Sequence, residues 1–161
     1  MKNNYLLLVT CCFLLISCDP GRQYPDEPVI KFESYSIKDT IEPLLGNPAQ
    51  ILILKISFTD GDGDIGLDAI DTLPPKDNCM DSTCSNIYIN ATVIKNGYSQ
   101  ELPYNYRIPV ITPTGQNKAL KGEIDVKLIF IPPYDTAICE IYLVDRKLHR
   151  SEIITTPKIA L

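Results

Sequence analysis

The sequence predicts an all-β protein built as one antiparallel sandwich of two sheets and about seven strands. Three observations support this prediction in the 161-residue chain. Apolar and polar side chains alternate along five separate windows, as in strands that bury one face. Turn residues separate these windows, and no window combines helical spacing with capping residues. Seven short strands in a chain of this length favour two packed sheets.

The elements follow a polar, proline-containing segment over residues 19–28. The five clear strand windows are, in order, Ile51–Thr59, Ile87–Ile94, Leu102–Val110, Ile124–Ile131 and Ala137–Val144. Weaker candidates flank them at Val29–Ile37 and Glu152–Ile159. Turn signals such as Asn96-Gly97 and Asp145-Arg146-Lys147 lie between the windows. Together these windows account for the seven predicted strands.

Two tyrosines in the third window raise the question of a sugar-binding surface. Tyr104 and Tyr106 alternate on one strand face with Leu102, Ile108 and Val110. A face shared with three aliphatic side chains is typical of a core. We therefore expect both tyrosines to pack inward rather than to form an aromatic platform.

The start of the chain has the three-part layout of a secretory signal peptide. Lys2 supplies a positive charge, Tyr5–Ile16 is almost wholly apolar, and Ser17 precedes Cys18. The apolar run is too short to cross a bilayer as a helix. The ending resembles the lipobox of bacterial lipoproteins, in which the cysteine is acylated and becomes the first residue of the mature protein.

This resemblance implies a signal peptide over residues 1–17, a lipidated tether over 18–28 and one domain over 29–161. The protein would then be anchored in the cell envelope by lipid on Cys18, most simply at the outer membrane, facing either the periplasm or the surface. Several acyl chains on one cysteine make such an anchor stable. The formal net charge of −5 and the lack of a basic cluster argue against nucleic acid as a partner.

Sorting the six cysteines leaves one candidate disulfide. Cys11 and Cys12 belong to the signal segment, and Cys18 carries the lipid. Cys79 and Cys84 flank a short loop, and export to an oxidising compartment favours a bond between them over a zinc site. The remaining Cys139 lies in a strand window, where we expect it to be buried.

An acidic segment after the first clear strand is the one chemically distinctive motif. Counted from Asp60, the carboxylates of the segment fall at positions 1, 3, 5, 9 and 12, which is the ligand spacing of a calcium loop; they belong to Asp60, Asp62, Asp64, Asp68 and Asp71. Clustered carboxylates repel one another unless a cation lies among them. The pattern predicts bound calcium, with the first three aspartates as its main ligands.

The motif departs from an EF-hand, and a second interpretation stays open. Position 6, which is glycine in the EF-hand, is Ile65, and the preceding segment is a strand rather than a helix. Under the alternative, Gly61, Gly63 and Gly66 simply allow an acidic surface turn, with Ile65 and Leu67 tucked beneath it.

Several segments together resemble the small immunoglobulin-like lipoproteins of Bacteroidota. The resemblance rests on Phe58–Leu67, which contains the DGDGDIG letters, on Asn117–Gly122, on Ile141–Arg146 and on Thr156-Pro157. It implies an immunoglobulin-like sandwich in the envelope. In such a fold the loop after the second strand, the loop between the last two strands and the chain start share one end. Asp145, with Asp26 or Glu27, would then lie near Asp60–Asp64.

A second resemblance concerns modification. Four Asp-hydroxyl dipeptides followed by an apolar residue or threonine resemble the O-glycosylation motif of exported proteins from the same bacterial group; the acceptors would be Thr40, Thr72, Ser82 and Thr136. Chance, together with the preference of turns for aspartate and threonine, is the alternative explanation.

Nothing in the sequence indicates an enzyme. The single histidine, His149, has no nucleophile motif to pair with, and no phosphate-binding loop or metalloprotease motif occurs. We therefore expect a non-enzymatic structural or protein-interaction module whose partner is another envelope protein or a surface polymer. The alternative is an accessory glycan- or peptide-binding lipoprotein of a nutrient-uptake system.

Overall fold

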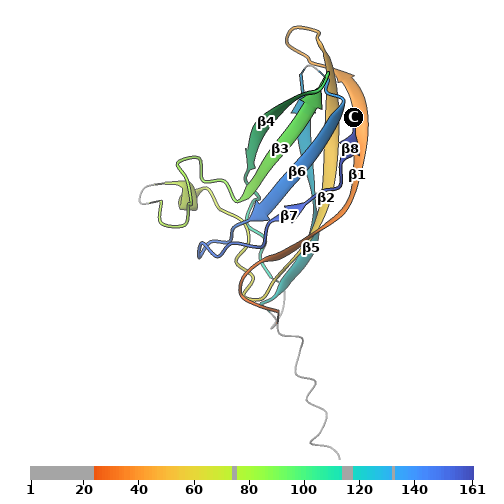
Figure 1. Cartoon of the computed structure of the whole chain (residues 1–161). Coiled ribbons are helices and arrows are strands. Elements are labelled where there is room, and N and C mark those ends of the chain that lie inside the picture. Colours follow the sequence, from red (N-terminus) through yellow and green to blue (C-terminus); the bar gives the residue numbers. More distant parts are fainter. Residues whose placement is uncertain (1–23, 74–75, 114–117, 132) are drawn as a thin grey trace, which may run out of the picture.

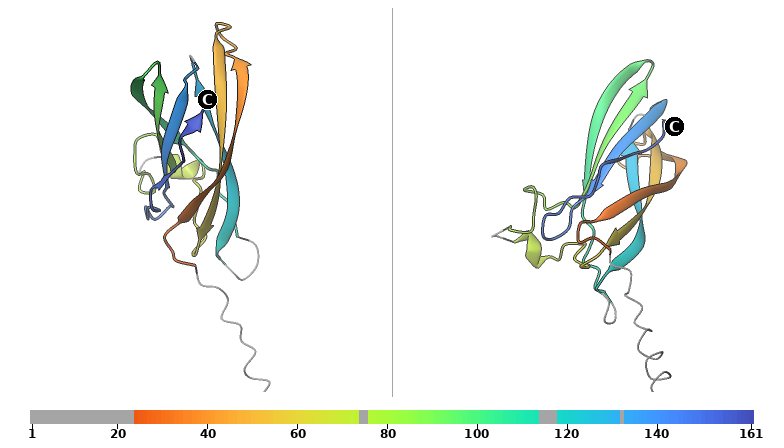
Figure 2. Two further views of the ribbon diagram at one scale, coloured as in Figure 1. Left: turned by 45° about the vertical axis from the view of Figure 1, so that its right-hand side comes forward. Right: turned by 60° about the horizontal axis from the view of Figure 1, so that its bottom comes forward.

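A computed structural model of the chain describes residues 24–73, 76–113, 118–131 and 133–161. It confirms a sandwich of two antiparallel sheets, which the two views of Figure 2 show as separate layers. Cys18 and the signal segment lie outside the described residues. In the described part of the chain, no helix has the length and apolar character needed to span a membrane.

The first sheet has three strands in the order β1-β2-β5 (Figure 1). Their bounds are β1 Val29–Ile41, β2 Pro48–Asp60 and β5 Leu120–Phe130. The second sheet has the order β4-β3-β6-β7, with β8 also paired to β6. Its strands are β3 Ile87–Lys95, β4 Tyr98–Tyr106, β6 Thr136–Leu143, β7 Ile154–Thr155 and β8 Ile159–Ala160. The chain therefore crosses between the sheets after β2, after β4 and after β5, as strands do in immunoglobulin-like folds.

The period-two pattern of the strands fills the space between the sheets. Leu52, Leu54 and Ile56 of β2 are buried against Ile89 and Val93 of β3, together with their neighbours in one apolar core. The free thiol of Cys139 on β6 belongs to this core, as predicted. The core therefore consists of alternate residues from both sheets, which fixes the register of each strand.

Most observed strands extend a few residues beyond their predicted windows, and two differ in kind. The strand predicted over Leu102–Val110 starts earlier, at Tyr98, because Asn96-Gly97 forms a tight turn that pairs Lys95 with Tyr98. It ends at Tyr106, and Ile108 beyond it still packs into the core. The strand predicted over Glu152–Ile159 is split into β7 and β8, with Pro157 between them.

The free edge of β5 is closed by tyrosines from the opposite sheet. The hydroxyl of Tyr104 donates to the carbonyl of Ile129 at 3.0 Å, and that of Tyr106 donates to the carbonyl of Lys127 at 2.6 Å. Both rings pack against the core, so the expected inward placement is confirmed. The two side chains seal one side of the sandwich and are unavailable as a sugar platform.

Candidate metal centre

Four aspartates from two parts of the chain meet at one end of the sandwich. Asp60 is the last residue of β2, and the turn that follows it carries Asp62 and Asp64. Asp145 is the second residue after β6, on the opposite sheet. One carboxylate oxygen from each of the four lies within 4.8 Å of the others. The predicted approach of Asp145 to the acidic segment is therefore confirmed.

Three of these carboxylates each have a buried oxygen without a hydrogen-bond partner. Asp60 is fully buried, and the side chains of Asp62 and Asp64 are only 16% and 13% exposed. The Oδ1 atoms of all three are shielded from water and make no hydrogen bond. Such an oxygen loses its hydration without compensation, which destabilises the fold unless a ligand supplies the missing contact. This is an observation independent of the clustering itself.

The fourth carboxylate is held rigidly. Oδ1 of Asp145 accepts the backbone N–H groups of Lys147 at 2.9 Å and His149 at 2.8 Å. Oδ2 of Asp145 lies 2.8 Å from Nδ1 of His149. The loop after β6 therefore closes around its own aspartate and points it at the turn after β2.

Basic side chains from the same loop lie on the outside of the cluster. Nζ of Lys147 pairs with Oδ2 of Asp62 and lies 3.8 Å from Oδ2 of Asp64. Nε of Arg146 donates to the backbone carbonyl of Asp64 at 3.1 Å. The cations use the outer oxygens and a main-chain carbonyl, and they leave the inner Oδ1 atoms free.

Two glycines allow the turn to fold this closely. A Cβ at Gly61 would lie 2.3 Å from the carbonyl oxygen of Tyr24, and one at Gly63 would lie 1.9 Å from that of Lys118. Gly63 also has a φ of +73°, which favours glycine. Ile65, where an EF-hand has glycine, is fully buried in the core. The expected burial of Ile65 beneath the turn is thus confirmed, and it occurs together with the carboxylate cluster.

Crowding perturbs the acidity of the cluster. Burial, followed by the charge of Asp62, raises the pKa of Asp60 from 3.8 to about 6. Burial, followed by the charge of Asp145, raises the pKa of Asp64 to about 6. Burial is also the largest influence on Asp62 and opposes its ionisation, but the hydrogen bond and charge of Lys147, with smaller contributions from Asp64 and His149, together outweigh burial and lower the pKa of Asp62. The cluster therefore gains protons readily when no other cation neutralises it.

The chain segment that precedes β1 contacts the same turn. The N–H of Gly61 donates to the carbonyl of Pro25 at 2.8 Å. The pKa of Lys147 is raised first by its bond to Asp62, with a further contribution from the charge of Asp26. The pKa of His149 is raised first by Asp145, with a further contribution from Glu27. Asp26 and Glu27 thus act on the basic side chains around the cluster, although neither belongs to the group of four.

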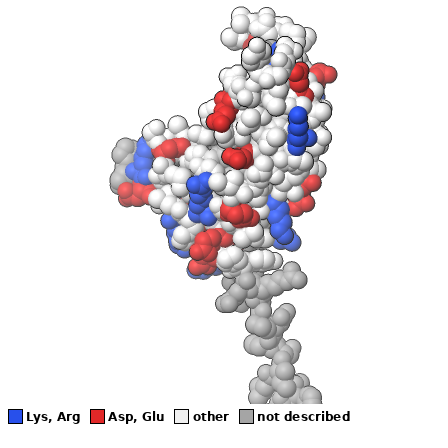
Figure 3. All heavy atoms as spheres, in the orientation of Figure 1, with Lys and Arg blue, Asp and Glu red and all other residues white. Residues whose placement is uncertain are grey.

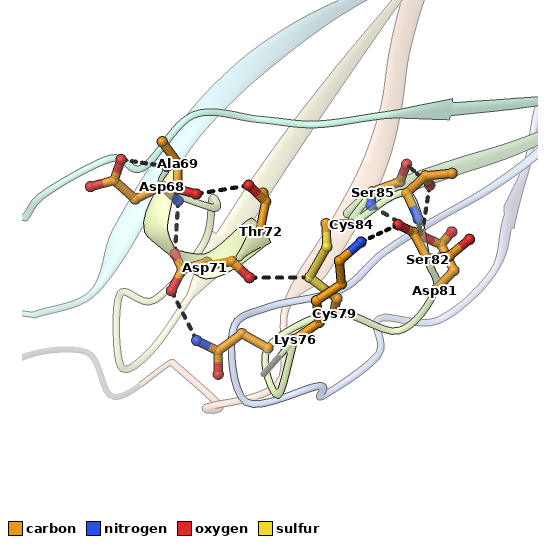
Figure 4. Close-up of a disulfide and its surroundings, with 12 residues drawn as sticks. Asp68, Ala69, Asp71, Thr72, Lys76, Cys79, Asp81, Ser82, Cys84 and Ser85 are labelled. Atoms are coloured by element: carbon orange, nitrogen blue, oxygen red, sulfur yellow. Dashed lines mark hydrogen bonds between the residues drawn. A yellow bond between two sulfur atoms is a disulfide. The ribbon is translucent and has the colours of Figure 1, made fainter. Parts of the chain in front are cut away.

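The structure corrects the prediction for Asp68 and Asp71, whose carboxylates lie outside the cluster. Oδ2 of Asp71 accepts the N–H of Asp68 at 2.7 Å, and its Oδ1 accepts Nδ2 of Asn78 at 2.9 Å (Figure 4). Leu67 pairs with Pro109, which carries the chain away from the turn before Asp68 is reached. Both carboxylates instead organise the loop around the short 3-10 helix Ile70–Thr72.

The predicted disulfide is present in this loop. Cys79 and Cys84 are bonded (Figure 4), and their Cα atoms are 4.7 Å apart. The loop projects sideways from the sandwich between β2 and β3 (Figure 1). A zinc site at this position is therefore ruled out by the bond between its two sulfur atoms.

The four residues of the glycosylation prediction differ in setting. Ser82 is exposed in the disulfide loop, whereas Thr40, Thr72 and Thr136 are half-buried. Oγ1 of Thr72 also donates to the carbonyl of Ala69 at 2.7 Å. Ser82 is the most accessible of the four acceptors.

The donor set of the cluster can hold a metal ion. It consists of carboxylate oxygens alone, the ligands that hard cations prefer, while zinc and copper sites draw on imidazole and thiolate groups. Sequence reasoning identified all four members and also expected two residues that take no part. Comparison with known protein families, with curated proteins and with solved structures finds no match to this chain.

Proposed function

We propose that this protein is a lipid-anchored module of the cell envelope with a structural or protein-interaction role, and that calcium braces its anchored end. The supporting observation is the trio of buried, unpartnered Oδ1 atoms on Asp60, Asp62 and Asp64 beside Asp145. An unfilled arrangement of this kind destabilises a fold, and a divalent cation removes that penalty.

Calcium fits this donor set better than other divalent ions. It accepts six to eight oxygen ligands in flexible geometry, so that four carboxylates plus water can satisfy it. Magnesium requires a near-ideal octahedron and retains several waters, which suits a largely buried carboxylate group less well. Exported proteins also meet calcium at concentrations that weak sites can use.

The position of the site suggests what the ion does. Asp60 belongs to the first sheet, Asp145 follows a strand of the second, and Gly61 between the aspartates holds the tether at Pro25. One ion would therefore join both sheets and the chain segment that leads to the membrane. This arrangement suits a domain that bears load or contacts partners while attached at one end.

The lipid anchor rests on the lipobox resemblance at Cys18, and the kinship with Bacteroidota lipoproteins rests on the acidic turn and its companion segments. Acidic and basic side chains alternate over the face drawn in Figure 3. A mixed surface of this kind supports protein partners or polymers over nucleic acid.

A nutrient-uptake role finds less support at the surface. A shallow depression of about 240 Å³ on the second sheet contains Tyr88, Tyr142 and Arg150. The Tyr88 and Tyr142 rings stack with centroids 4.8 Å apart, and Arg150 lies 3.7 Å above the Tyr142 ring. The faces of Tyr142 are thus covered by protein, so this ring is closed to stacking on a sugar.

Calorimetric titration of residues 19–161 with calcium tests the brace. We expect one ion per chain, with binding lost in an Asp64→Asn variant and kept in Asp68→Asn, whose carboxylate lies outside the cluster. Incorporation of a labelled fatty acid into the full chain, compared with Cys18→Ser, tests the anchor. Absence of calcium binding in the wild-type domain, or equal labelling of both chains, would remove the corresponding part of the proposal.

A further inference from the structure

We propose that Lys147 sets the charge selectivity of the cation site, favouring divalent over trivalent ions. The inference rests on the proposed calcium site and adds a role for a residue that is not itself a ligand. Lys147 contacts three of the four aspartates, namely Asp62, Asp64 and Asp145.

Lys147 and a bound cation can occupy the same carboxylates simultaneously. Nζ of Lys147, whose side chain is largely exposed, contacts Oδ2 of Asp62 and lies 3.8 Å from Oδ2 of Asp64. The Oδ1 atoms of the same two residues are buried and make no hydrogen bond. The ammonium group therefore need not leave when an ion binds.

The backbone of Lys147 is held in place by the carboxylate of Asp145. Its backbone N–H donates to Oδ1 of Asp145 at 2.9 Å. Its side chain is 57% exposed, so substitution leaves the core untouched. A variant at this position should fold and report on charge alone.

The neighbouring charges act less directly on the carboxylates. Arg146 bonds a backbone carbonyl, and His149 contacts only the aspartate of its own loop. Asp26 and Glu27, from the tether, interact with Lys147 and His149 respectively. Lys147 thus places its positive charge directly on two of the three aspartates that carry unpartnered oxygens.

The expected effect follows from Coulomb's law. The repulsion between the ammonium group and the ion is proportional to the charge of the ion. If each unit of ionic charge weakens binding about threefold, removal of the ammonium charge strengthens calcium binding about tenfold and terbium binding about thirtyfold. The ratio of the two affinities would then move about threefold towards the trivalent ion.

The experiment measures dissociation constants for Ca²⁺ and Tb³⁺ in residues 19–161 at one pH and ionic strength. Lys147→Gln should bind both ions more tightly and shift the ratio towards Tb³⁺. Lys147→Arg, which keeps the charge, should retain the wild-type ratio. Lys38→Gln changes the net charge equally, far from the cluster on β1, and should also leave the ratio unchanged.

Three contrary outcomes are distinguishable. The wild-type domain could bind calcium while Lys147→Gln leaves the ratio of the Ca²⁺ and Tb³⁺ affinities unchanged or binds both ions more weakly. That result would overturn the selectivity role and leave the calcium site standing. If the wild-type domain binds neither ion, the proposed function and this inference fall together. A shift shared by Lys147→Gln and Lys38→Gln would reduce the effect to net charge and would also overturn the inference.

Discussion

Asp60 ends a strand of one sheet and Asp145 follows a strand of the other, yet their carboxylates belong to one cluster with Asp62 and Asp64. Asp60 is fully buried with an unpartnered Oδ1, and Asp145 is held by three contacts from its own loop. One carboxylate therefore has a buried oxygen without a partner, and the other is held by its own loop within the same cluster. Under the proposed function, a cation at this point would stabilise this end of the sandwich.

Asp60→Asn should abolish the response to calcium without harming the metal-free fold. The amide keeps an oxygen for the N–H of Asp64, which now lies 2.8 Å from Oδ2, and it removes a buried charge. We expect the melting temperature in EDTA to be unchanged or higher. Calcium should no longer raise it, whereas a retained calcium shift would show that Asp60 is no ligand.

The metal-free protein should lose stability as pH rises from about 4 to 7. Asp60 and Asp64 have a pKa of about 6 when folded, against an ordinary value of 3.8. A raised pKa means that folding favours the protonated form. Its stabilisation is complete below about 3.8 and is lost as pH rises through 6. The raised pKa of His149 acts in the same direction.

Melting in EDTA across this pH range measures the effect. The calcium-induced increase in melting temperature should grow over the same interval, because protons then compete less with the ion. A double variant, Asp60→Asn with Asp64→Asn, should flatten most of the dependence. An equally steep dependence in that variant would assign it to His149 or to other groups.

Gly61→Ala should release the tether. The new Cβ would lie 2.3 Å from the carbonyl oxygen of Tyr24 and 2.5 Å from that of Pro25, so one side must move. We expect a loss of more than about 1 kcal/mol in unfolding free energy. In a chain that begins at Asp26 both carbonyls are missing, and the same substitution should cost little. An equal loss of unfolding free energy in both chains would show that Gly61 is not required by its contact with residues 24 and 25.

Tyr104→Phe and Tyr106→Phe should each lower the free energy of unfolding by about 1 kcal/mol. Each removes a hydroxyl that donates to a carbonyl on the unpaired edge of β5. Tyr98→Phe is the matched control, because Tyr98 is 82% exposed. Denaturant unfolding of the three variants measures the difference, and equal stabilities would contradict the edge-sealing role.

Replacing Cys79 and Cys84 by serine should cost about 2 kcal/mol, because the disulfide closes a short loop. The calcium response should persist, since Asp71 and the rest of the disulfide loop lie outside the cluster. Melting with and without calcium in the double-serine variant separates the two effects. A lost calcium response would tie the loop to the site after all.

The sequence predicted the sandwich well because burial on one strand face is a local signal. Leu52, Leu54 and Ile56 alternate visibly, and the core confirms them. The limits of β4 were less predictable, since Asn96-Gly97 sets its start through pairing, and Ile108 remains apolar beyond its end. The alternation of apolar residues along one strand does not show which strand it pairs with or where that pairing ends.

The sequence predicted the four aspartates of the site but not the contacts of the residues around them. Asp60, Asp62 and Asp64 were identified by spacing, and Asp145 by the shared end of an immunoglobulin-like sandwich. Spacing also suggested Asp68 and Asp71, but the pairing of Leu67 with Pro109 turns the chain away. The contacts of Lys147 depend on how the two loops face one another, which no local pattern encodes.

Thermal unfolding of residues 19–161 in EDTA and in millimolar calcium, beside an Asp62→Ala/Asp64→Ala double variant, tests the central claim most directly. Binding to the folded state alone adds about 2.7 kcal/mol at a hundredfold excess over the dissociation constant. The account predicts a clear calcium-induced rise in the wild-type melting temperature and none in the double variant. Identical wild-type melting in both buffers would contradict the calcium brace and leave the cluster an acidic turn.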